Sequence, residues 1–560
     1  MKHDFTSIPD RSRFGSSKWE IAKNASMEFV PLSVADMEFP TARPIVDSIK
    51  KLAEEAILGY TNPTQEYYDA VVSWMKRRHS FDIKKEWLLQ TPGIINALAM
   101  LIESVTKPGD GVIVMPPVYY PFDMTIIATG RRSVFCPLIE NNGRYEINYA
   151  LLEELAKDEN NTALIFCNPH NPVGRVWSAD ELKKTAEICC NNNVFIIDDE
   201  IHNDLIMPGY EHTVMANVSE EAKNNIAVCT APSKTFNLAG VQCSNIIIPN
   251  DEIRAKATIR NKMNMQMHLN VFAYTICTAA YNECEDWLDE LLSVIAGNAK
   301  CVEDFMAENF PEIKVYPLEG TYLQWLDVRA LGMTHLEVRE MLEDANIYLD
   351  NGEMFGALGR GYQRINLACA KSTLEKALER FKSAVENARA KDKEYHKTLE
   401  IGDTLEEINA DKTTLVVFGR KSECKLTEDL LDTLKEKYAE FESANLDIKF
   451  IVPSAKSDKD YPFEIISDTE AVLYKKYNVF EADSAVYAVA GDKMFEEKVG
   501  GDSVKIMESK VFAPTDENEF RPLQLFAFIG IDENKKVVYS YYSKTIGDFP
   551  NINEIIERLK

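Results

Sequence analysis

Residues 230–240 read TAPSKTFNLAG, and this stretch decides both the fold and the chemistry that we predict for the chain. Lys234 follows an apolar run and small residues, and it precedes a turn rich in Asn and Gly. A lysine that acts as a nucleophile has to be desolvated enough to exist as a neutral amine, and it has to reach a carbonyl carbon. An ordinary surface lysine at the end of a strand is the alternative, so the surrounding sequence has to decide between the two.

Around this stretch, apolar runs alternate with amphipathic helical patterns from about residue 46 to residue 285. The expected strands include DGVIVMPP, TALIFCNP, NVFIIDDE and NNIAVCTAP, and the expected helices include PIVDSIKKLAEEAI, NYALLEELAKD and SADELKKTAEICC. Short continuous apolar strands separated by helices are typical of an α/β fold with a mostly parallel sheet covered on both faces. Ligands of such sheets bind beyond the carboxyl ends of the strands.

Two further motifs place polar side chains at these strand ends. IIDDEIHNDL (196–205) ends a very apolar run in acids. A carboxylate at Asp199 can keep a pyridine nitrogen protonated, although two acids that cap the following helix are the alternative. CNPHNPVG (167–174) is a turn fixed by two X-Pro steps, and the amide of Asn171 can donate a hydrogen bond there.

Two more motifs offer an aromatic ring and an anion site. MPPVYYPF (115–122) follows a strand and presents Tyr119 for stacking on a planar ring, or either tyrosine for ordinary loop packing. LLQTPGIINAL (88–98) places a glycine turn before an apolar helix, whose free N–H groups can hold a phosphate. Any helix start shows the same pattern, so this last motif is informative only together with the others.

Five such elements in this order resemble the fold-type I aminotransferase superfamily of pyridoxal 5'-phosphate (PLP) enzymes. The details resemble its MalY/PatB group of C–S β-lyases, typified by cystathionine β-lyase. These details are VADMEFP, GYT, VYYPF, CNPHNPVGRVW, DEIHNDL, APSKTFNLAG, EGTYLQWLD and RINLAC, and they cover about residues 1–390. Ser33 departs from the group, which usually has Trp before VADM, so substrate preference follows less directly from the resemblance.

The resemblance implies a PLP cofactor with a role for each matching residue. Lys234 would carry PLP as a Schiff base, Asp199 would pair with its pyridine nitrogen, and Tyr119 would stack on its ring. Asn171 would contact the phenolate oxygen, and His202 occupies the position of a residue that assists there. Groups implied for the phosphate are Gly93, Ile94, Ile95, Ser233, Thr230 and, from the neighbouring subunit of a homodimer, Tyr60. Groups implied for the substrate are Arg364, which would grip the α-carboxylate, and the loop residues Ala35 and Asp36.

The activity implied by the resemblance is β-elimination from S-substituted cysteines, which releases a thiol, pyruvate and ammonia. An aminotransferase on the same fold would use the same residues, so residue chemistry leaves that alternative open. Members of the group also act through protein contacts, which leaves open an additional regulatory role.

The domain pattern changes twice along the chain. We expect residues 1–395 to form the PLP-enzyme part, with a large domain at about 46–285 and a small α+β domain from 1–45 and 286–395. A charged stretch near 386–400 reads as a linker. Residues 400–560 resemble the thioredoxin-like α/β fold, especially peroxiredoxin-type domains, with Cys424 where their first active-site cysteine lies. The second cysteine position holds Thr427, and the Pro and Thr that precede a peroxidatic cysteine are absent from GRKSEC, so we expect a redox-inactive or adaptor domain in which Cys424 is incidental.

Composition limits the classes of binding partner and the cellular compartment that we expect for the chain. The formal net charge of −27 over 560 residues disfavours nucleic acid and anionic membranes as partners. No apolar run approaches the roughly 20 residues of a membrane span, and the first residues show no secretory signal. The 11 cysteines include no CxxC pair and no metal-ligand spacing, so we expect no metal and a reducing, cytoplasmic environment.

Overall fold

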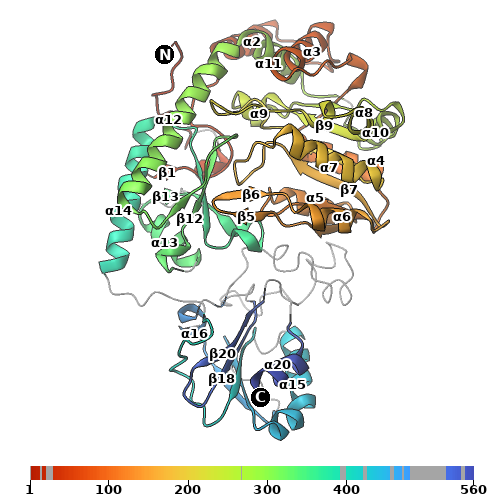
Figure 1. The fold of residues 1–560 in the computed structure, drawn as a ribbon. Helices are drawn as coiled ribbons and strands as arrows, with labels where there is room; N and C mark the ends of the chain where they lie inside the picture. The colour runs from red at the N-terminus through yellow and green to blue at the C-terminus, as the bar shows by residue number, and fades with distance from the viewer. Residues whose placement is uncertain are drawn as a thin grey trace. The chain divides into compact units, whose positions relative to one another are not determined.

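The computed structural model describes residues 2–12, 15–20, 29–266, 268–333, 335–390, 399–420, 425–453, 460–469, 472–477, 479, 525–543 and 549–560. The chain divides into two compact units. The first consists of Met1–Leu331 and Arg339–Lys391, and the second of Gly332–Val338 and Asp392–Lys560. Each unit is described by itself, and Figure 1 shows the first from red through green to turquoise and the second from turquoise to dark blue.

A seven-stranded sheet forms the centre of the first unit, in the order β2-β10-β9-β8-β7-β3-β4. All neighbouring strands pair in parallel except at β10, which is antiparallel to both of its neighbours. The mostly parallel sheet predicted from the sequence is therefore confirmed. Its strands are β2 (Leu88–Thr91), β3 (Gly111–Val114), β4 (Arg132–Phe135), β7 (Asn161–Cys167), β8 (Phe195–Asp199), β9 (Ile226–Thr230) and β10 (Ser244–Ile247).

Apolar side chains on both faces of this sheet are buried. On one face, Ile165 and Ile197 join a core cluster that includes Leu98 of helix α4 (Ile94–Val105). On the other face, Leu164 and Ile196 are fully buried. Burial on both faces explains why these strands read as continuous apolar runs. The helices of this part are α2 (Arg43–Glu55), α3 (Gln65–His79), α4 (Ile94–Val105), α5 (Pro121–Ala128), α6 (Tyr149–Ala156), α7 (Ala179–Asn191), α8 (Glu220–Asn224), α9 (Pro232–Thr235), α10 (Asp251–Met263) and α11 (Val271–Glu283).

The rest of the first unit is built around a small antiparallel sheet of four strands, in the order β11-β12-β15-β14. A separate parallel pair joins β1 (Val30–Pro31) to β13 (Ile347–Tyr348), so the N-terminal segment lies with this part. The strands of the sheet are β11 (Lys314–Val315), β12 (Leu323–Asp327), β14 (Asp350–Asn351) and β15 (Tyr362–Asn366), and the hairpin β5 (Ile139–Asn141) and β6 (Arg144–Glu146) belongs to the same unit. The helices are α1 (Ser17–Glu20), α12 (Glu285–Asn309), α14 (Lys371–Ala390) and, from Arg339 onward, α13 (His335–Asp344).

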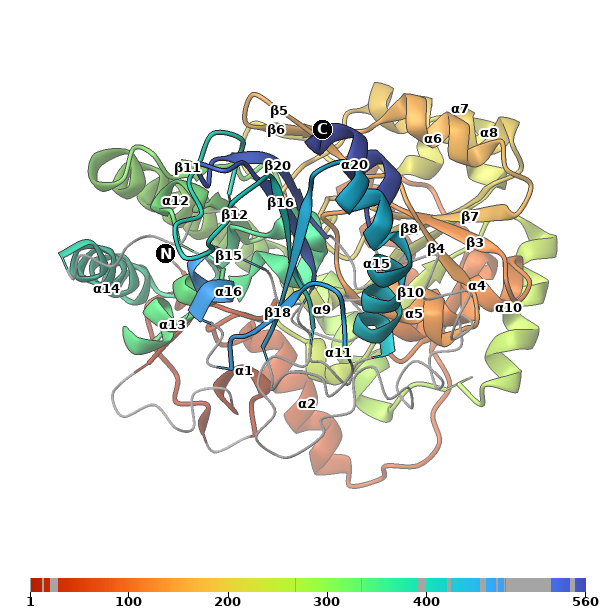
Figure 2. The same ribbon diagram turned by 90° about the horizontal axis from the view of Figure 1, so that it is seen from below.

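The second unit contains a five-stranded sheet in the order β18-β17-β16-β19-β20. The first three strands are parallel, and β19 and β20 run antiparallel to their neighbours. The strands are β16 (Thr414–Phe418), β17 (Asp447–Val452), β18 (Glu464–Ser467), β19 (Ala527–Ile531) and β20 (Val537–Tyr542), and the helices include α15 (Lys425–Ser443), α16 (Val472–Lys476) and α20 (Ile552–Leu559). Figure 2 shows α15 and α20 close together beside this sheet, and residues of both helices line one surface pocket.

Two further predictions from the sequence concern a membrane span and the cysteine positions of the second unit. Among the helices of the described residues, none is both long and apolar enough to cross a membrane. Cys424 lies outside the described residues, while Thr427 is fully buried in the first turn of α15.

Candidate active site

Lys234 lies on the single-turn helix α9, directly after the carboxyl end of β9. The pKa of its amine is lowered to about 8, mainly by burial and then by the positive charge of Arg364, while the charges of Asp36 and Asp199 oppose these effects. The amine donates a hydrogen bond of 2.6 Å to the carbonyl oxygen of Ala35. An amine that loses its proton near neutral pH is suited to nucleophilic and general-base work. The alternative of an ordinary surface lysine does not fit this environment.

Asp199 is the last residue of β8 and is only 3% exposed. Burial raises the pKa of its carboxyl group to about 7, against the opposing effects of the N–H group of Ile201 and the charge of Lys234. Ile201 donates to the carboxylate from 3.2 Å. A buried carboxylate of this kind gains a strong partner when a protonated heterocyclic nitrogen faces it. Its use as a helix cap, the alternative from sequence, is limited to that one backbone bond.

Asn171 and Arg364 form a direct pair. Nη1 of Arg364, on β15, donates to Oδ1 of Asn171 at 2.7 Å. Because the amide oxygen is the acceptor in this pair, the amide NH2 is the end that remains to donate to an anionic oxygen. Arg364 also donates Nε and Nη2 to Oδ2 of Asp350 at 3.1 and 2.5 Å, and its guanidinium lies 4.6 Å from the ring centre of Phe355.

His202 and Tyr119 both lie within the electrostatic influence of Arg364. His202 is 3% exposed, and burial together with the charges of Lys234 and Arg364 lowers its pKa well below the ordinary value. Its Nδ1 atom is buried without a hydrogen-bond partner among the described residues. Burial raises the pKa of the Tyr119 hydroxyl group. The charge of Asp199 raises it as well, and the charge of Arg364 opposes this. A neutral imidazole with an unused nitrogen and a neutral phenol ring are both suited to a planar polar ligand.

The candidate phosphate groups lie where β2 ends and α4 begins. Gly93 is the N-cap of α4 with φ +91°, a backbone conformation that favours glycine, and open space surrounds the position of an added Cβ. The N–H groups of Ile94 and Ile95 open the helix, whose positive end favours an anion. Ser233 is partly buried on α9. Thr230 differs, because its hydroxyl group donates to the carbonyl oxygen of Asn245 at 3.2 Å and keeps its proton within the sheet.

Tyr60 stands apart from these residues. It lies between α2 and α3 and is fully exposed, so this chain does not bring it to the other candidate residues. The prediction that it reaches a neighbouring subunit remains a prediction.

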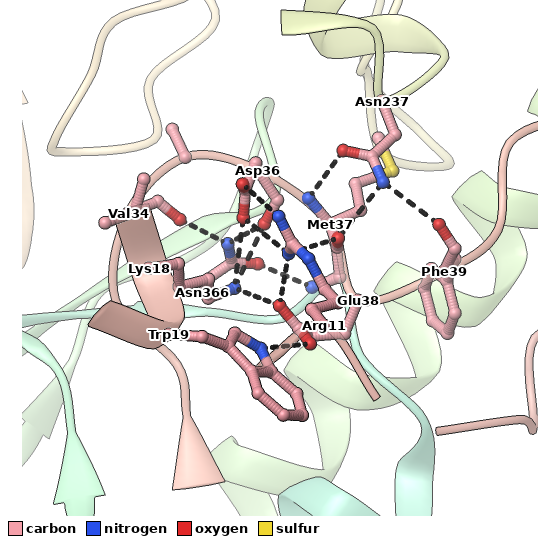
Figure 3. A network of polar contacts seen from close by, with 12 residues as sticks. Arg11, Lys18, Trp19, Val34, Asp36, Met37, Glu38, Phe39, Asn237 and Asn366 are labelled. Carbon is pink, nitrogen blue, oxygen red and sulfur yellow. Dashed lines mark hydrogen bonds and ion pairs between the residues drawn. The ribbon is translucent and has the colours of Figure 1, made fainter. Parts of the chain in front are cut away.

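The sequence reasoning missed a set of groups that surround the loop of residues 33–38. Tyr322 donates its hydroxyl to the carbonyl oxygen of Ala35 at 2.8 Å, and Asp350 accepts the backbone N–H of Val34 at 3.2 Å. Arg11 and Lys18, from the N-terminal segment, pair with Asp36 (Figure 3). These contacts join segments far apart in the chain, and no local motif marked them.

Together the amine, the buried carboxylate, the amide donor and the helix N-terminus fit PLP at the carboxyl edge of the central sheet. A fold of this topology with this site defines the class of PLP-dependent enzymes of fold type I. The comparisons with known proteins agree, since the profile described as "Aminotransferase class I and II" matches residues 28–381, well over half of the chain. The chain belongs to this family.

The relatives narrow the comparison. The chain is 40% identical over 357 residues to "Cystathionine beta-lyase PatB" of Bacillus subtilis (strain 168), a match that covers 64% of this chain and 92% of the relative. Among solved structures, cystalysin from Treponema denticola, which contains PLP, superposes with a TM-score of 0.68 at 45% identity over 69% of this chain and 100% of the other. A PLP-bound C–S lyase from Staphylococcus hominis superposes with a TM-score of 0.64 at 31% identity, over 69% of this chain and 98% of the other.

Proposed function

We propose that the chain is a PLP-dependent C–S β-lyase of the cystathionine β-lyase type. One molecule of an S-substituted cysteine and one of water would give a thiol, pyruvate and ammonium. The observation that carries this proposal is the placement of Lys234 and Asp199 at one edge of the central sheet, with the charge of Arg364, from the small sheet, acting on Lys234. The chain is also 40% identical to a relative named as a cystathionine β-lyase.

The roles of the residues follow from their environments. PLP, when bound, withdraws electrons from the α-carbon of the amino acid. Asp199, as a carboxylate, holds the proton on the pyridine nitrogen, and Asn171 donates its amide NH2 to the phenolate oxygen. Lys234, whose amine has a pKa of about 8, takes the α-proton at its Nζ atom. Arg364 holds the α-carboxylate by a two-point pair, which fixes the orientation of the bond that breaks.

A homodimer completes the proposal. The side chains of Ile57, Leu58 and Tyr60, between α2 and α3, are 78%, 59% and 105% exposed. Adjacent apolar and aromatic side chains that are this exposed favour a surface covered by a partner. A second copy of the chain would cover them, and Tyr60 would then reach the phosphate in the partner.

The second unit is proposed to be a thioredoxin-like domain that acts as an adaptor. The order β17-β16-β19-β20, with α15 between the two parallel strands and α20 after the antiparallel pair, supports this fold. The buried Thr427 at the position of a second active-site cysteine supports a redox-inactive domain. We also propose the cytoplasm as the compartment, because all ten cysteines among the described residues are free thiols.

The direct test is an assay of thiol and pyruvate across a panel of S-substituted cysteines, without any added keto acid. Both products in equal amounts support the lyase. Pyruvate that forms only when a keto acid is supplied would replace it with the aminotransferase, which uses the same residues.

A further inference from the structure

The loop of residues 33–38 holds a strained turn beside the reactive lysine. Val34 has φ +53°, a conformation that a β-branched residue rarely adopts. The N–H group of Asp36 donates to the carbonyl oxygen of Val34 at 2.9 Å, which closes the turn around Ala35. The carbonyl oxygen of Ala35 in turn accepts the bond from Lys234. Strained backbone of this kind persists only where its surroundings over-determine it.

Side chains from the small sheet hold the backbone of this turn from one side. Nδ2 of Asn366 donates to the carbonyl oxygens of Val34 and Asp36, each at 2.7 Å. Asp350 accepts the N–H of Val34 and at the same time holds Arg364. The turn and the guanidinium of Arg364 therefore share one carboxylate, so a ligand carboxylate held by Arg364 must lie next to the turn.

The N-terminal segment holds the same loop by binding its two acidic side chains, Asp36 and Glu38 (Figure 3). Arg11 pairs with both oxygens of Asp36, at 3.1 and 2.8 Å, and with Glu38 at 2.7 Å. Nζ of Lys18 lies 3.2 Å from Glu38 and 3.6 Å from Asp36, and it donates to the backbone carbonyl of Asp36 at 3.1 Å. Trp19 donates its indole N–H to Glu38 at 3.1 Å.

Burial makes this cluster different from a surface ion pair. Lys18 is 1% exposed and Glu38 is 4% exposed. A buried charge that loses its partner is strongly destabilising, so two cations opposite two carboxylates form a balanced unit. Burial alone would raise the pKa of Asp36, but its bond to Arg11 and the charge of Lys18 hold that pKa below the ordinary value. Asp36 is therefore a carboxylate whose charge is neutralised from the N-terminal side.

We propose that Arg11 and Lys18 are positioning residues for the α-carboxylate subsite. They fix the turn around Ala35 and neutralise Asp36, so that an anionic ligand carboxylate can approach Arg364 without repulsion. The proposal rests on the proposed function, in that it takes an α-amino acid as the substrate. It makes the N-terminal segment a determinant of selectivity for ligands that carry this carboxylate.

The test compares two ligands that differ in the α-carboxylate alone. S-methyl-L-cysteine carries it, and 2-(methylthio)ethylamine lacks it. The PLP-loaded full chain is titrated with each ligand and the absorbance change is followed, for the wild type and for Lys18→Met, which removes the charge but keeps most of the side-chain volume. Lys2→Met is the matched control, because Lys2 pairs with Asp286 at the exposed surface and does not contact this loop.

We expect Lys18→Met to weaken binding of the amino acid by roughly tenfold or more, as expected for a misplaced binding group, and to leave binding of the amine within about twofold. The KM for the amino acid should rise by a similar factor with kcat much less affected, and Lys18→Arg should restore most of the loss. Equal losses for both ligands, or no loss for the amino acid, would overturn the proposal, because a merely structural role predicts one of these two results.

A second variant keeps the test decisive if Lys18→Met does not fold. Arg11→Lys retains the charge but loses the two-point pair with Asp36, and it should show the same selective loss to a smaller degree. A wild type that binds both ligands but releases no thiol would contradict the proposed lyase activity alone. The titrations would still decide the role of Arg11 and Lys18.

Discussion

The Nζ atom of Lys234 lies 2.6 Å from the carbonyl oxygen of Ala35, a residue 199 positions earlier in the chain. This bond joins the end of the central sheet to the loop that borders the substrate. It places the amine at the meeting point of the two parts of the first unit. The same amine is the base that we propose for the α-proton, so the fold brings this proposed base and the loop of residues 33–38 together.

Replacement of Lys234 by Ala should abolish lyase turnover. Without the amine, no group at this position can attach the cofactor covalently. Treatment with borohydride followed by mass analysis should therefore find no adduct on the peptide around residue 234. Lys256→Ala, at a half-exposed lysine on α10, is the control and should retain both the adduct and the activity. Full activity in Lys234→Ala would contradict the assignment of the site.

Asp199→Ala should still bind some PLP but lose most of its activity, by about a hundredfold or more, because the pyridine nitrogen loses the charge that keeps it protonated. Steady-state rates at saturating cofactor measure this loss.

The neighbouring Asp198 supplies a matched control. Burial and the charge of Glu200 raise its pKa well above the ordinary value, so Asp198→Asn resembles its protonated form. Successive strand residues face opposite sides of a sheet, and this control should keep activity within a few-fold. A near-normal rate in Asp199→Ala would mean that another group holds the proton.

Uptake of PLP by the apoprotein should rise with pH through about 8. Below that pH the amine of Lys234 is protonated and cannot attack a carbonyl, and above it the amine is neutral. An ordinary lysine would place this midpoint near 10.4. The rate of uptake, followed by absorbance at a series of pH values, gives the midpoint directly.

Arg364→Met provides the check on the cause of this midpoint. The positive charge of Arg364 contributes to the lowered pKa of Lys234, after the larger effect of burial. Its removal should move the midpoint to higher pH. A midpoint that stays where it was would show that the charge of Arg364 does not act on the amine.

The sequence was sufficient to predict the central sheet and the strand-end residues, for a physical reason. Parallel strands bring their carboxyl ends to one edge, so Asp199 at the end of β8 and Lys234 after β9 had to lie close together once the strands were recognised. The antiparallel β10 was not separable from its neighbours, because buried strands of either direction read as apolar runs.

Local sequence patterns could not predict the contacts around the loop of residues 33–38. Asp350 contacts the N–H of Val34 across 316 positions, and Lys18 reads in SSKWE as an ordinary polar residue although it is buried against Asp36 and Glu38. The resemblance implied Thr230 as a phosphate ligand, but its hydroxyl group donates to Asn245 within the sheet. The direction of that hydroxyl depends on the pairing of β9 with β10, which the motif does not show. Such contacts depend on how distant segments meet, and a single sequence carries no periodic signal for them.

Removal of the second unit should leave the lyase intact. A chain that ends near residue 395 keeps every candidate residue of the PLP site and the whole of α14. That helix belongs to the first part, since Phe381 packs on Phe310 and Arg389 pairs with Glu312. Residues from about 400 onward should fold alone, because two hydrophobic core clusters are formed entirely by residues between 399 and 559. About 160 residues are enough for an independent core.

Absorbance of bound PLP, pyruvate release and circular dichroism of the two separate pieces test this prediction. A chain that ends near residue 370 is the matched control, and it should lose solubility or cofactor because it exposes the apolar surface that α14 covers, including Phe310. If the chain ending near residue 395 were insoluble or free of cofactor while the full chain was active, the first unit would need the second in order to fold. If that shorter chain bound PLP but turned over slowly, the second unit would act on catalysis, and its role would go beyond that of an adaptor.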